Sequence, residues 1–320
     1  MQRPPRVPPP AGSRLLDVLV VGDANPDLVL LGDVVPRFGQ VEQILQRADL
    51  VLAGSAGIVA CGTARLGLRT ALAAHVGTDL FGDLMVSGLA ARGVDTSLVQ
   101  RDRGTPTGLS VILSTPGDRA ILTLPGTIPL QRADEIDDDA LAATRHVHLA
   151  SWFLIPGLAA GALDLFRRAH AAGATTSLDT NWDPAGTWDG VADVLAETDL
   201  FLPNTAELLA IAGDDGSIAD AGRRLRSTGL LLAVKTGATG GLGWGPDGEC
   251  RAPPIGVEVV DTTGAGDSFD AGFLAGWLDG RPFGECLRWA VVAGSLSTRA
   301  AGGTAAQPTR EELAAYVRAT

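Results

Sequence analysis

Lysine is almost absent from this chain: Lys235 is the only one, and every other member of its 25 basic residues is arginine. Asparagine is nearly as rare, with only Asn25, Asn181 and Asn204. The three cysteines are isolated and form no C-x-x-C pair. This pattern argues against a disulfide framework or a structural zinc site, and it favours a reducing, cytoplasmic setting.

Long apolar segments are also lacking. No uninterrupted apolar run approaches the ~18 residues of a membrane-spanning helix, so no membrane association is expected. The first residues, MQRPPRVPPPAG, carry basic charge without an apolar stretch, which is not the pattern of a signal peptide. Their proline content instead predicts a disordered or polyproline tail over residues 1–14.

Positive charge is scarce overall. The 320 residues include 25 Lys and Arg against 37 Asp and Glu, which gives a net charge of −12. A protein this acidic is not expected to coat nucleic acid or an anionic membrane. A nucleotide site stays compatible with the charge, because backbone amides and Mg²⁺ can hold phosphates locally. The 46% of hydrophobic residues predicts a globular fold, and no Pro/Ser-rich linker divides residues 15–320.

Short apolar runs alternate with amphipathic segments along most of the chain. Runs that are rich in aliphatic residues predict buried strands at 17–22, 70–75, 146–150, 175–178, 200–202 and 230–234. Helices are predicted at 57–66, 80–92, 158–172, 191–197, 205–212, 218–227, 265–278 and 283–300. This alternation predicts an α/β fold in which a doubly wound, mostly parallel sheet has helices on both faces.

Residues 108–124 depart from the alternation. Two apolar runs flank a Pro-Gly-Asp turn, which predicts a β-hairpin. A hairpin does not fit a chain of alternating strands and helices, so this segment is expected to lie outside the main sheet. A further strand is predicted at 28–31.

The most specific local pattern is DTTGAGDSF at residues 261–269, which opens a predicted helix. Gly264 and Gly266 permit close approach of the backbone to a ligand. The free amides of Gly264, Ala265 and Gly266 at the helix N-terminus form an anion hole. Asp267 lies at the same opening, where a carboxylate is suited to accept a proton from a hydroxyl that attacks a phosphate.

With the residues that follow, DTTGAGDSFDAGFLAG resembles the C-terminal signature of the ribokinase family, the phosphofructokinase-B type carbohydrate kinases. The resemblance extends from about residue 18 to about residue 308. It implies a kinase that transfers the γ-phosphate of ATP to a hydroxyl of a sugar or sugar derivative, with Mg²⁺ as cofactor. It also implies a ribokinase-like fold with a small β-sheet lid, whose strands are expected at about 28–52 and 107–125.

The same resemblance implies roles for residues around the nucleotide. Asp267 matches the family's catalytic base, and the glycine turn before it matches the anion hole. Asn204 and Glu207 match an N-x-x-E motif that organises Mg²⁺ and phosphate through water, with Glu207 toward the metal. By itself this spacing is more typical of helix capping. The strand end expected to line the nucleotide comprises Lys235, Thr236, Gly237 and Gly240.

Residues in the N-terminal half match the substrate-binding part of the family. GDANPD at 22–27 resembles the signature of the first strand, which implies that Asn25 and Asp27 bind the substrate. A carboxylate can accept two hydroxyl donors, which suits a polyol. Gly54 is expected to approach the substrate closely.

Three positions depart from the family pattern, the first being Ala53, which stands where the first of two glycines is usual. The family usually has Gly-Gly-x-x-x-Asn where this chain has residues 53–58, and Ile58 replaces the asparagine that binds a sugar hydroxyl. Three alternatives follow: the substrate lacks that hydroxyl, it presents an apolar group there, or sugar binding has been lost. Asp183 stands where an arginine is frequent, which puts an arginine contact to an anionic substrate in doubt.

Other functions were weighed against a sugar kinase. A nucleoside kinase of the same family and a catalytically silent sugar- or nucleotide-binding protein both stay open. A hydrolase is disfavoured, because the AGSAG segment around Ser55 lacks the first glycine and the preceding strand of a nucleophile elbow. His146 and His148 alternate on one strand face, but without a third ligand near in sequence they are expected to be packing residues rather than metal ligands.

Two further expectations rest on the resemblance. A monovalent-cation site, for K⁺, is expected near Asp261 and residues 300–303. A homodimer is expected through the lid, because pairing two lids covers the exposed edges of their strands.

Overall fold

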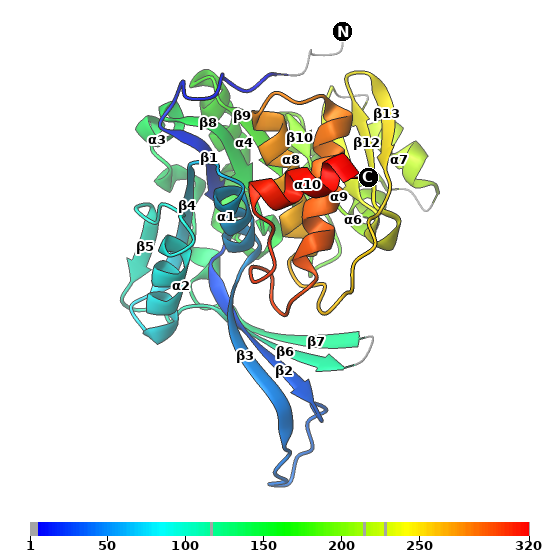
Figure 1. Ribbon diagram of the computed structural model, residues 1–320. Helices are drawn as coiled ribbons and strands as arrows, with labels where there is room; N and C mark the ends of the chain where they lie inside the picture. The colour runs from blue at the N-terminus through cyan, green and yellow to red at the C-terminus, as the bar shows by residue number, and fades with distance from the viewer. Residues whose placement is uncertain (1–5, 116–117, 214–215, 227–228, 320) are drawn as a thin grey trace.

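The structure is a computed structural model, and it describes residues 6–115, 118–213, 216–226 and 229–319. It consists of a large body and a small projecting sheet (Figure 1). In the body, helices surround a nine-stranded sheet, whereas the projecting sheet has four strands. The predicted α/β class is confirmed. The large sheet accounts for the segments in which strands and helices alternate, and the small sheet accounts for the segments that depart from this alternation.

The large sheet contains β1 (Leu16–Val21), β4 (Thr70–Gly77), β5 (Val99–Asp102), β8 (Thr144–Leu149), β9 (Thr175–Leu178), β10 (Leu200–Phe201), β11 (Leu231–Lys235), β12 (Gly241–Gly245) and β13 (Gly248–Ala252). Their spatial order is β13-β12-β11-β10-β9-β8-β1-β4-β5. From β11 to β5 all neighbours pair in parallel, whereas β12 is antiparallel to both β11 and β13. The carboxyl ends of the parallel strands therefore meet at one edge, where ligands bind in folds of this kind.

Helices cover both faces of this sheet, as predicted. One face carries α1 (Ser55–Arg65), α2 (Leu80–Ala90), α8 (Ala265–Leu278), α9 (Phe283–Ser297) and α10 (Arg310–Ala319). The opposite face carries α3 (Asp138–Ala142), α4 (Pro156–Ala171), α5 (Val191–Leu195), α6 (Thr205–Ala212) and α7 (Ile218–Arg226). Short 3₁₀ helices lie at Ile128–Leu130, Ala133–Glu135, Trp152–Leu154 and Gly237–Thr239.

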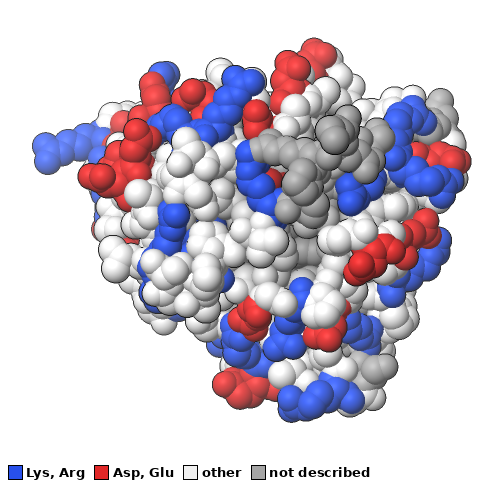
Figure 2. Space-filling model, turned by 90° about the horizontal axis from the view of Figure 1, so that it is seen from above, with Lys and Arg blue, Asp and Glu red and all other residues white. Residues whose placement is uncertain are grey.

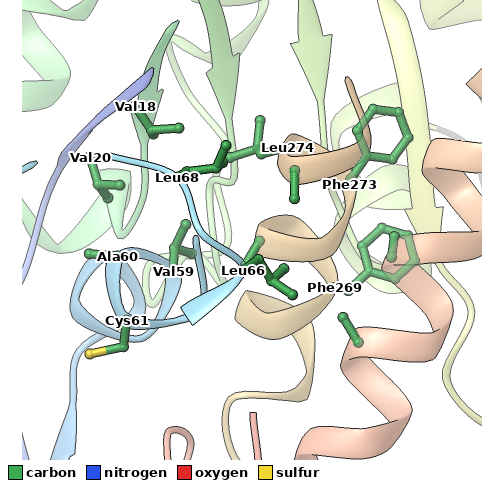
Figure 3. Close-up of a cluster of buried hydrophobic side chains, with 14 of the residues drawn as sticks. Val18, Val20, Val59, Ala60, Cys61, Leu66, Leu68, Phe269, Phe273 and Leu274 are labelled. Carbon is green, nitrogen blue, oxygen red and sulfur yellow. The ribbon is translucent and has the colours of Figure 1, made fainter. Parts of the chain in front are cut away.

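Two hydrophobic cores result, one on each side of the sheet. In β1, Val18 and Val20 belong to the first core, while Leu19 and Val21 belong to the second. This alternation follows from the two-residue period of a strand. Figure 3 shows the first core, in which side chains of β1, α1 and α8 gather on one face of the sheet.

The packing of α1 on α8 depends on small residues. A Cβ atom at Gly62 of α1 would lie 2.7 Å from the Cβ atom of Ala271 in α8, which is too close for any larger side chain. Glycine therefore lets the two helices approach closely. The contact also brings together their N-terminal ends, where the candidate catalytic residues lie.

The small sheet, called the lid below, contains β2 (Asn25–Gly32), β3 (Leu45–Ala53), β6 (Leu109–Thr115) and β7 (Asp118–Leu124), in the order β3-β2-β6-β7. Strands β6 and β7 form the predicted antiparallel hairpin, of whose turn residues 116–117 lie outside the described residues. Because β2 follows β1 closely and β3 leads directly into α1, the lid joins the body beside the carboxyl ends of the central strands.

The N-terminal tail, predicted to be disordered or to form polyproline structure, is described from residue 6 onward. Residues 1–5 lie outside the described residues, whereas residues 6–14 lie against the body. Arg145 Nε donates a hydrogen bond to the Pro9 carbonyl at 2.7 Å, and Arg14 donates to the Ala172 carbonyl at 2.6 Å. These contacts join arginine side chains to backbone oxygen atoms, so the segment is held by polar contacts.

Surface charge is of mixed sign on the face away from the lid. Figure 2 shows this face, where arginine and acidic side chains are interspersed rather than gathered into one patch. Within the part of the chain that the structure describes, no helix has the length and hydropathy needed to cross a bilayer.

Candidate active site

The glycine turn before α8 has the geometry expected of an anion hole. Gly264 is the N-cap residue, in the left-handed region with φ of 70°. A Cβ atom there would lie 2.5 Å from the Gly303 Cα atom, so both the conformation and the space require glycine. Ala265 and Gly266 follow in the first turn, where amides have no partner within the helix. Asp267 is therefore on the same turn as the amides that would hold a phosphate.

Asp267 is buried and has an unusual protonation equilibrium. Asp267 is 9% exposed, and its carboxylate accepts a hydrogen bond from the hydroxyl of Ser55, which lies at the start of α1. Burial and the negative charge of Asp179 raise the pKa of Asp267, whereas the Ser55 hydroxyl and Lys235 lower it, and the resulting pKa is about 7. A carboxyl group with a pKa near neutrality is suited to exchange a proton during a reaction.

Lys235 lies among acidic side chains. Its Nζ atom is 2.6 Å from Asp179 Oδ2 and 2.9 Å from Asp270 Oδ2. Burial opposes the charged ammonium, but these carboxylates raise the pKa of Lys235, so the lysine is charged. Oxygen atoms of Asp179, Asp267 and Asp270 lie within 4.8 Å of one another, and the ammonium group bonds two of these carboxylates. Lys235 thus supplies positive charge directly below the anion hole.

The predicted nucleotide segment borders a cavity of about 410 Å³. Lys235, Gly237 and Gly240 line it, together with Ala265 and Gly266 of the glycine turn. Thr236 is not among the lining residues; its amide donates to the Gly240 carbonyl at 3.1 Å and shapes the loop. The remaining walls are mainly apolar and come from the segment after β13, α8 and α9: Pro254, Ile255, Val257, Val259, Phe269 and Val291. An apolar cavity beside a phosphate-binding turn fits a purine nucleotide.

Asn204 and Glu207 form a capping box at the start of α6. The Asn204 Oδ1 atom accepts the Glu207 amide at 3.0 Å, and Glu207 Oε2 accepts the Asn204 amide at 2.8 Å. Burial and the charge of Asp179 together raise the pKa of Glu207 to about 7. Two polar atoms take no part in the capping box: Asn204 Nδ2, which can donate a hydrogen bond, and Glu207 Oε1, which can accept one. These atoms fit a role toward phosphate and toward a hydrated Mg²⁺.

The predicted acceptor residues lie together where the lid joins the body. Asn25 Nδ2 donates to Asp27 Oδ1 at 3.2 Å, and a Cβ atom at Gly54 would lie 3.0 Å from Asn25 Oδ1. Burial and the charges of Asp23 and Asp267 together raise the pKa of Asp27 to about 7. The predicted hydroxyl-binding carboxylate therefore faces the same space as the predicted base.

Ile58 does not line this space as a polar residue would. It is 3% exposed, and a Cβ atom at Gly303 would lie 2.5 Å from its Cδ1 atom. Its side chain thus packs beneath the backbone of residues 303 and 264, which form the glycine turn and its neighbour. In this chain the position supports the anion hole by packing.

The lid touches the glycine turn. Arg119 of β7 donates a hydrogen bond to the Thr263 hydroxyl at 3.1 Å, and its charge lowers the pKa of Asp27. Asp261 binds the Thr263 amide at 2.9 Å and the Gly302 amide at 2.9 Å, so its carboxylate ties together the two segments of the expected K⁺ site. The K⁺ site itself stays a prediction.

The remaining singled-out residues have structural partners. The Asp183 carboxylate accepts the amides of Ala185, Thr187 and Trp188, each at 2.8 Å, so it organises its own loop. His146 and His148 are fully buried and both are hydrogen-bonded to the Ser177 hydroxyl at 2.7 Å. Both histidines therefore behave as the packing residues that the sequence favoured.

Three residues of the candidate site were not predicted from the sequence to belong to it. Ser55 was weighed only as a hydrolase nucleophile, Asn181 was noted as one of the rare asparagines, and Asp270 was given no role. Asp270 follows Asp267 by three residues on one helix, and this spacing could have placed both carboxylates on the same face. No local signal points to Ser55, because its partner lies 212 residues away in the chain.

Comparison with known proteins agrees with this geometry. A family model described as pfkB family carbohydrate kinase matches residues 15–310. An ATP-dependent ribose-1-phosphate kinase of Halopiger xanaduensis is 32% identical over 305 residues, which are 95% of this chain and 98% of that protein. The adenosine kinase of Sinorhizobium meliloti has a TM-score of 0.82 at 26% identity, covering 96% of this chain and 100% of that one. Ribokinase of Arabidopsis thaliana, complexed with ribose and ATP, has a TM-score of 0.81 at 24% identity, covering 95% and 99%.

The doubly wound sheet with its lid is thus a ribokinase-like fold. The chain belongs to the pfkB family of carbohydrate kinases and is an ATP-dependent sugar kinase of that family. The resemblance inferred from the DTTGAGDSF motif is confirmed.

Proposed function

We propose that this kinase transfers the γ-phosphoryl group of ATP to a hydroxyl group of a sugar or sugar derivative, with Asp267 as the general base. The observation that carries the proposal is the first turn of α8. It places a buried carboxyl group with a pKa of about 7 next to the amides of Gly264, Ala265 and Gly266. The Ala265 amide, expected from the sequence to be free, also donates to the Thr262 carbonyl at 3.2 Å. Acid–base catalysis is most effective when the pKa of the group lies near the working pH.

In the proposed reaction, a bond forms between the acceptor oxygen and the γ-phosphorus while the bond from phosphorus to the leaving ADP oxygen breaks. Asp267 takes the proton of the acceptor hydroxyl, and the three amides stabilise charge on the transferred group. Mg²⁺, when bound, supplies positive charge at the phosphates. Glu207 and Asn204 would hold its water shell and the phosphates, while Asn25, Asp27 and Gly54 would orient the acceptor.

The acceptor class is the finer part of the proposal. The ribose-1-phosphate kinase and the ribokinase favour a sugar or a sugar phosphate. The similarity to an adenosine kinase supports a nucleoside as the second candidate. Asp27, as a hydroxyl-binding carboxylate, suits either class because both carry vicinal hydroxyls.

The test is Mg-ATP-dependent release of ADP with a panel of ketoses, aldoses, sugar acids, ribose 1-phosphate and nucleosides. Asp267→Asn should lower the rate with the responding acceptor by about 10²- to 10⁴-fold while ATP still binds. Asp83→Asn is the matched control, because Asp83 lies in the first turn of α2 and is exposed. Retained transfer in Asp267→Asn would remove Asp267 from the role of base. Binding of ATP without ADP release for any acceptor would favour a silent binding protein.

A further inference from the structure

Ser55 has a place in the site that the proposed chemistry does not yet use. It is the first residue of α1 and follows Gly54, whose φ is 76°. This left-handed glycine ends β3 and turns the chain so that α1 starts opposite α8. Ser55 is neither deeply buried nor exposed, and its hydroxyl reaches the carboxylate of Asp267.

A chain of hydrogen bonds fixes the Ser55 hydroxyl. Asn181 Nδ2 donates to Ser55 Oγ at 3.2 Å, so the hydroxyl proton of Ser55 is directed to Asp267 Oδ1. Asn181 is itself held at both ends: its Oδ1 atom accepts the Ser151 amide at 2.7 Å, and its own amide donates to Asp179 Oδ1 at 3.0 Å. Its φ of 54° is a conformation that asparagine tolerates better than most residues. The chain therefore rests on backbone at the ends of β8 and β9.

Asp267 needs such a support. The charges of Asp179 and Asp23 raise its pKa and the charge of Lys235 lowers it, so several nearby charges act on this carboxylate. The bond from Ser55 occupies Oδ1. Among the described residues, no hydrogen bond to Oδ2 is found, and that atom stays accessible. One oxygen is thus anchored while the other is left for a substrate proton.

We propose that Ser55, held by Asn181, is a positioning residue for Asp267, which anchors Oδ1 so that Oδ2 faces the acceptor hydroxyl. This inference rests on the proposed role of Asp267. During transfer the acceptor proton passes to Oδ2, and Ser55 keeps its own proton. Its hydrogen bond to an ionised carboxylate is of the stronger, charge-assisted kind.

The experiment compares Ser55→Ala, Ser55→Cys and Ser55→Thr with the wild-type enzyme on the responding acceptor. Ser55→Ala should lower kcat by about 10- to 100-fold, the range expected when a catalytic group is misplaced by about 1 Å. The KM for ATP should not change. Ser55→Thr should restore kcat because it keeps the hydroxyl, and Ser55→Cys should be intermediate because a thiol is a weaker donor. Ser87→Ala is the matched control, since Ser87 binds only backbone oxygens of its own helix.

A second readout separates positioning from a general effect on the structure. The acidic limb of the pH profile of kcat/KM reports the pKa of the base in the free enzyme. Loss of the Ser55 donor raises that pKa, so the limb should move to higher pH in Ser55→Ala and return in Ser55→Thr. If Ser55→Ala keeps both kcat and the profile while Asp267→Asn is inactive, the role of Ser55 is wrong and that of Asp267 stands. If Asp267→Asn stays active, the proposed base itself is wrong. Should Ser55→Ala fail to fold, equal kcat and profiles in Ser55→Cys and Ser55→Thr would overturn the inference.

Discussion

Replacing Lys235 by methionine tests the electrostatic arrangement beneath the anion hole. The ammonium group is 12% exposed and bonds carboxylates of Asp179 and Asp270 that are 3% and 0% exposed. Methionine has a similar shape without charge, so Lys235→Met leaves these acids buried without a cation. Breaking a buried ion pair in this way costs about 3–5 kcal/mol. For a chain of this size the loss corresponds to a fall in melting temperature of roughly 4–7 °C.

The pH dependence of this loss gives a sharper test. In the wild-type protein, burial raises the pKa of Asp179, but the charge of Lys235 and its hydrogen bonds outweigh burial and hold the pKa below its usual value. Without Lys235, burial raises that pKa above the value in the unfolded chain. Stability of the variant is then present at low pH and is lost as the pH rises through the new pKa. Lys235→Met should therefore be destabilised more at about pH 8 than at about pH 5.

Urea unfolding followed by tryptophan fluorescence at both pH values measures the effect. The control is Arg223→Met, which removes an exposed ion pair to Asp220 of 2.6 Å and should change the free energy of unfolding by about 0–1 kcal/mol. Adding Asp179→Asn to Lys235→Met should recover part of the loss. A Lys235→Met protein within about 1 kcal/mol of wild type, or a loss independent of pH, would refute the reasoning.

Four further outcomes are expected. Asp267 has a pKa of about 7 in the folded protein, against about 3.9 when unfolded. Its preference for the protonated form therefore favours folding at low pH, and this contribution is lost as the pH rises through 7. Asp267→Asn should accordingly raise the melting temperature more at about pH 8 than at about pH 5, and equal shifts would contradict the assigned pKa. Arg119→Met removes the contact between the lid and the glycine turn; steady-state kinetics should show kcat/KM for the acceptor reduced by about 10-fold or more with ATP binding kept, and unchanged kinetics would exclude a role for this arginine. Ile58→Asn buries an amide in an apolar contact and should lower the free energy of unfolding by about 1–3 kcal/mol in urea without improving affinity for the acceptor; tighter sugar binding would show that the family's asparagine position has kept its function. Ile121 and Leu122 are 53% and 60% exposed on the lid; if two lids pair in a homodimer, replacing both by aspartate should give a monomer in sedimentation velocity, and a wild-type monomer would rule the pairing out.

The parts of the fold that follow local rules were predictable from the sequence. Helices α6 and α8 have the predicted bounds of 205–212 and 265–278, because each starts at a glycine or an N-cap residue and has an apolar face. Strands β12 and β13 were missed. The sequence of β12, GLGWG, has no β-branched residue, and it forms a strand only because it pairs with β11 and β13.

The candidate site also has one part that could be predicted from the sequence and one part that could not. The glycine turn and Asp267 are contiguous in sequence, so one motif predicts both. Lys235 was predicted to line the nucleotide, and it does border the cavity, but its ammonium group is committed to Asp179 and Asp270. That pairing, like the bond from Ser55 to Asp267, joins residues from separate elements and depends on how the helices pack. No spacing rule contains this information.

The central place of β1 has a consequence for how the protein is made. Its two neighbours are β4 and β8, and Leu16 pairs with Thr144. A ribosome therefore releases the apolar segment LDVLVV long before β8 exists to cover its second edge. Parallel pairing between distant segments is slow, and nascent strands without partners are prone to aggregate. During synthesis of the first half of the chain, β1 thus has an apolar edge that its later partner does not yet cover.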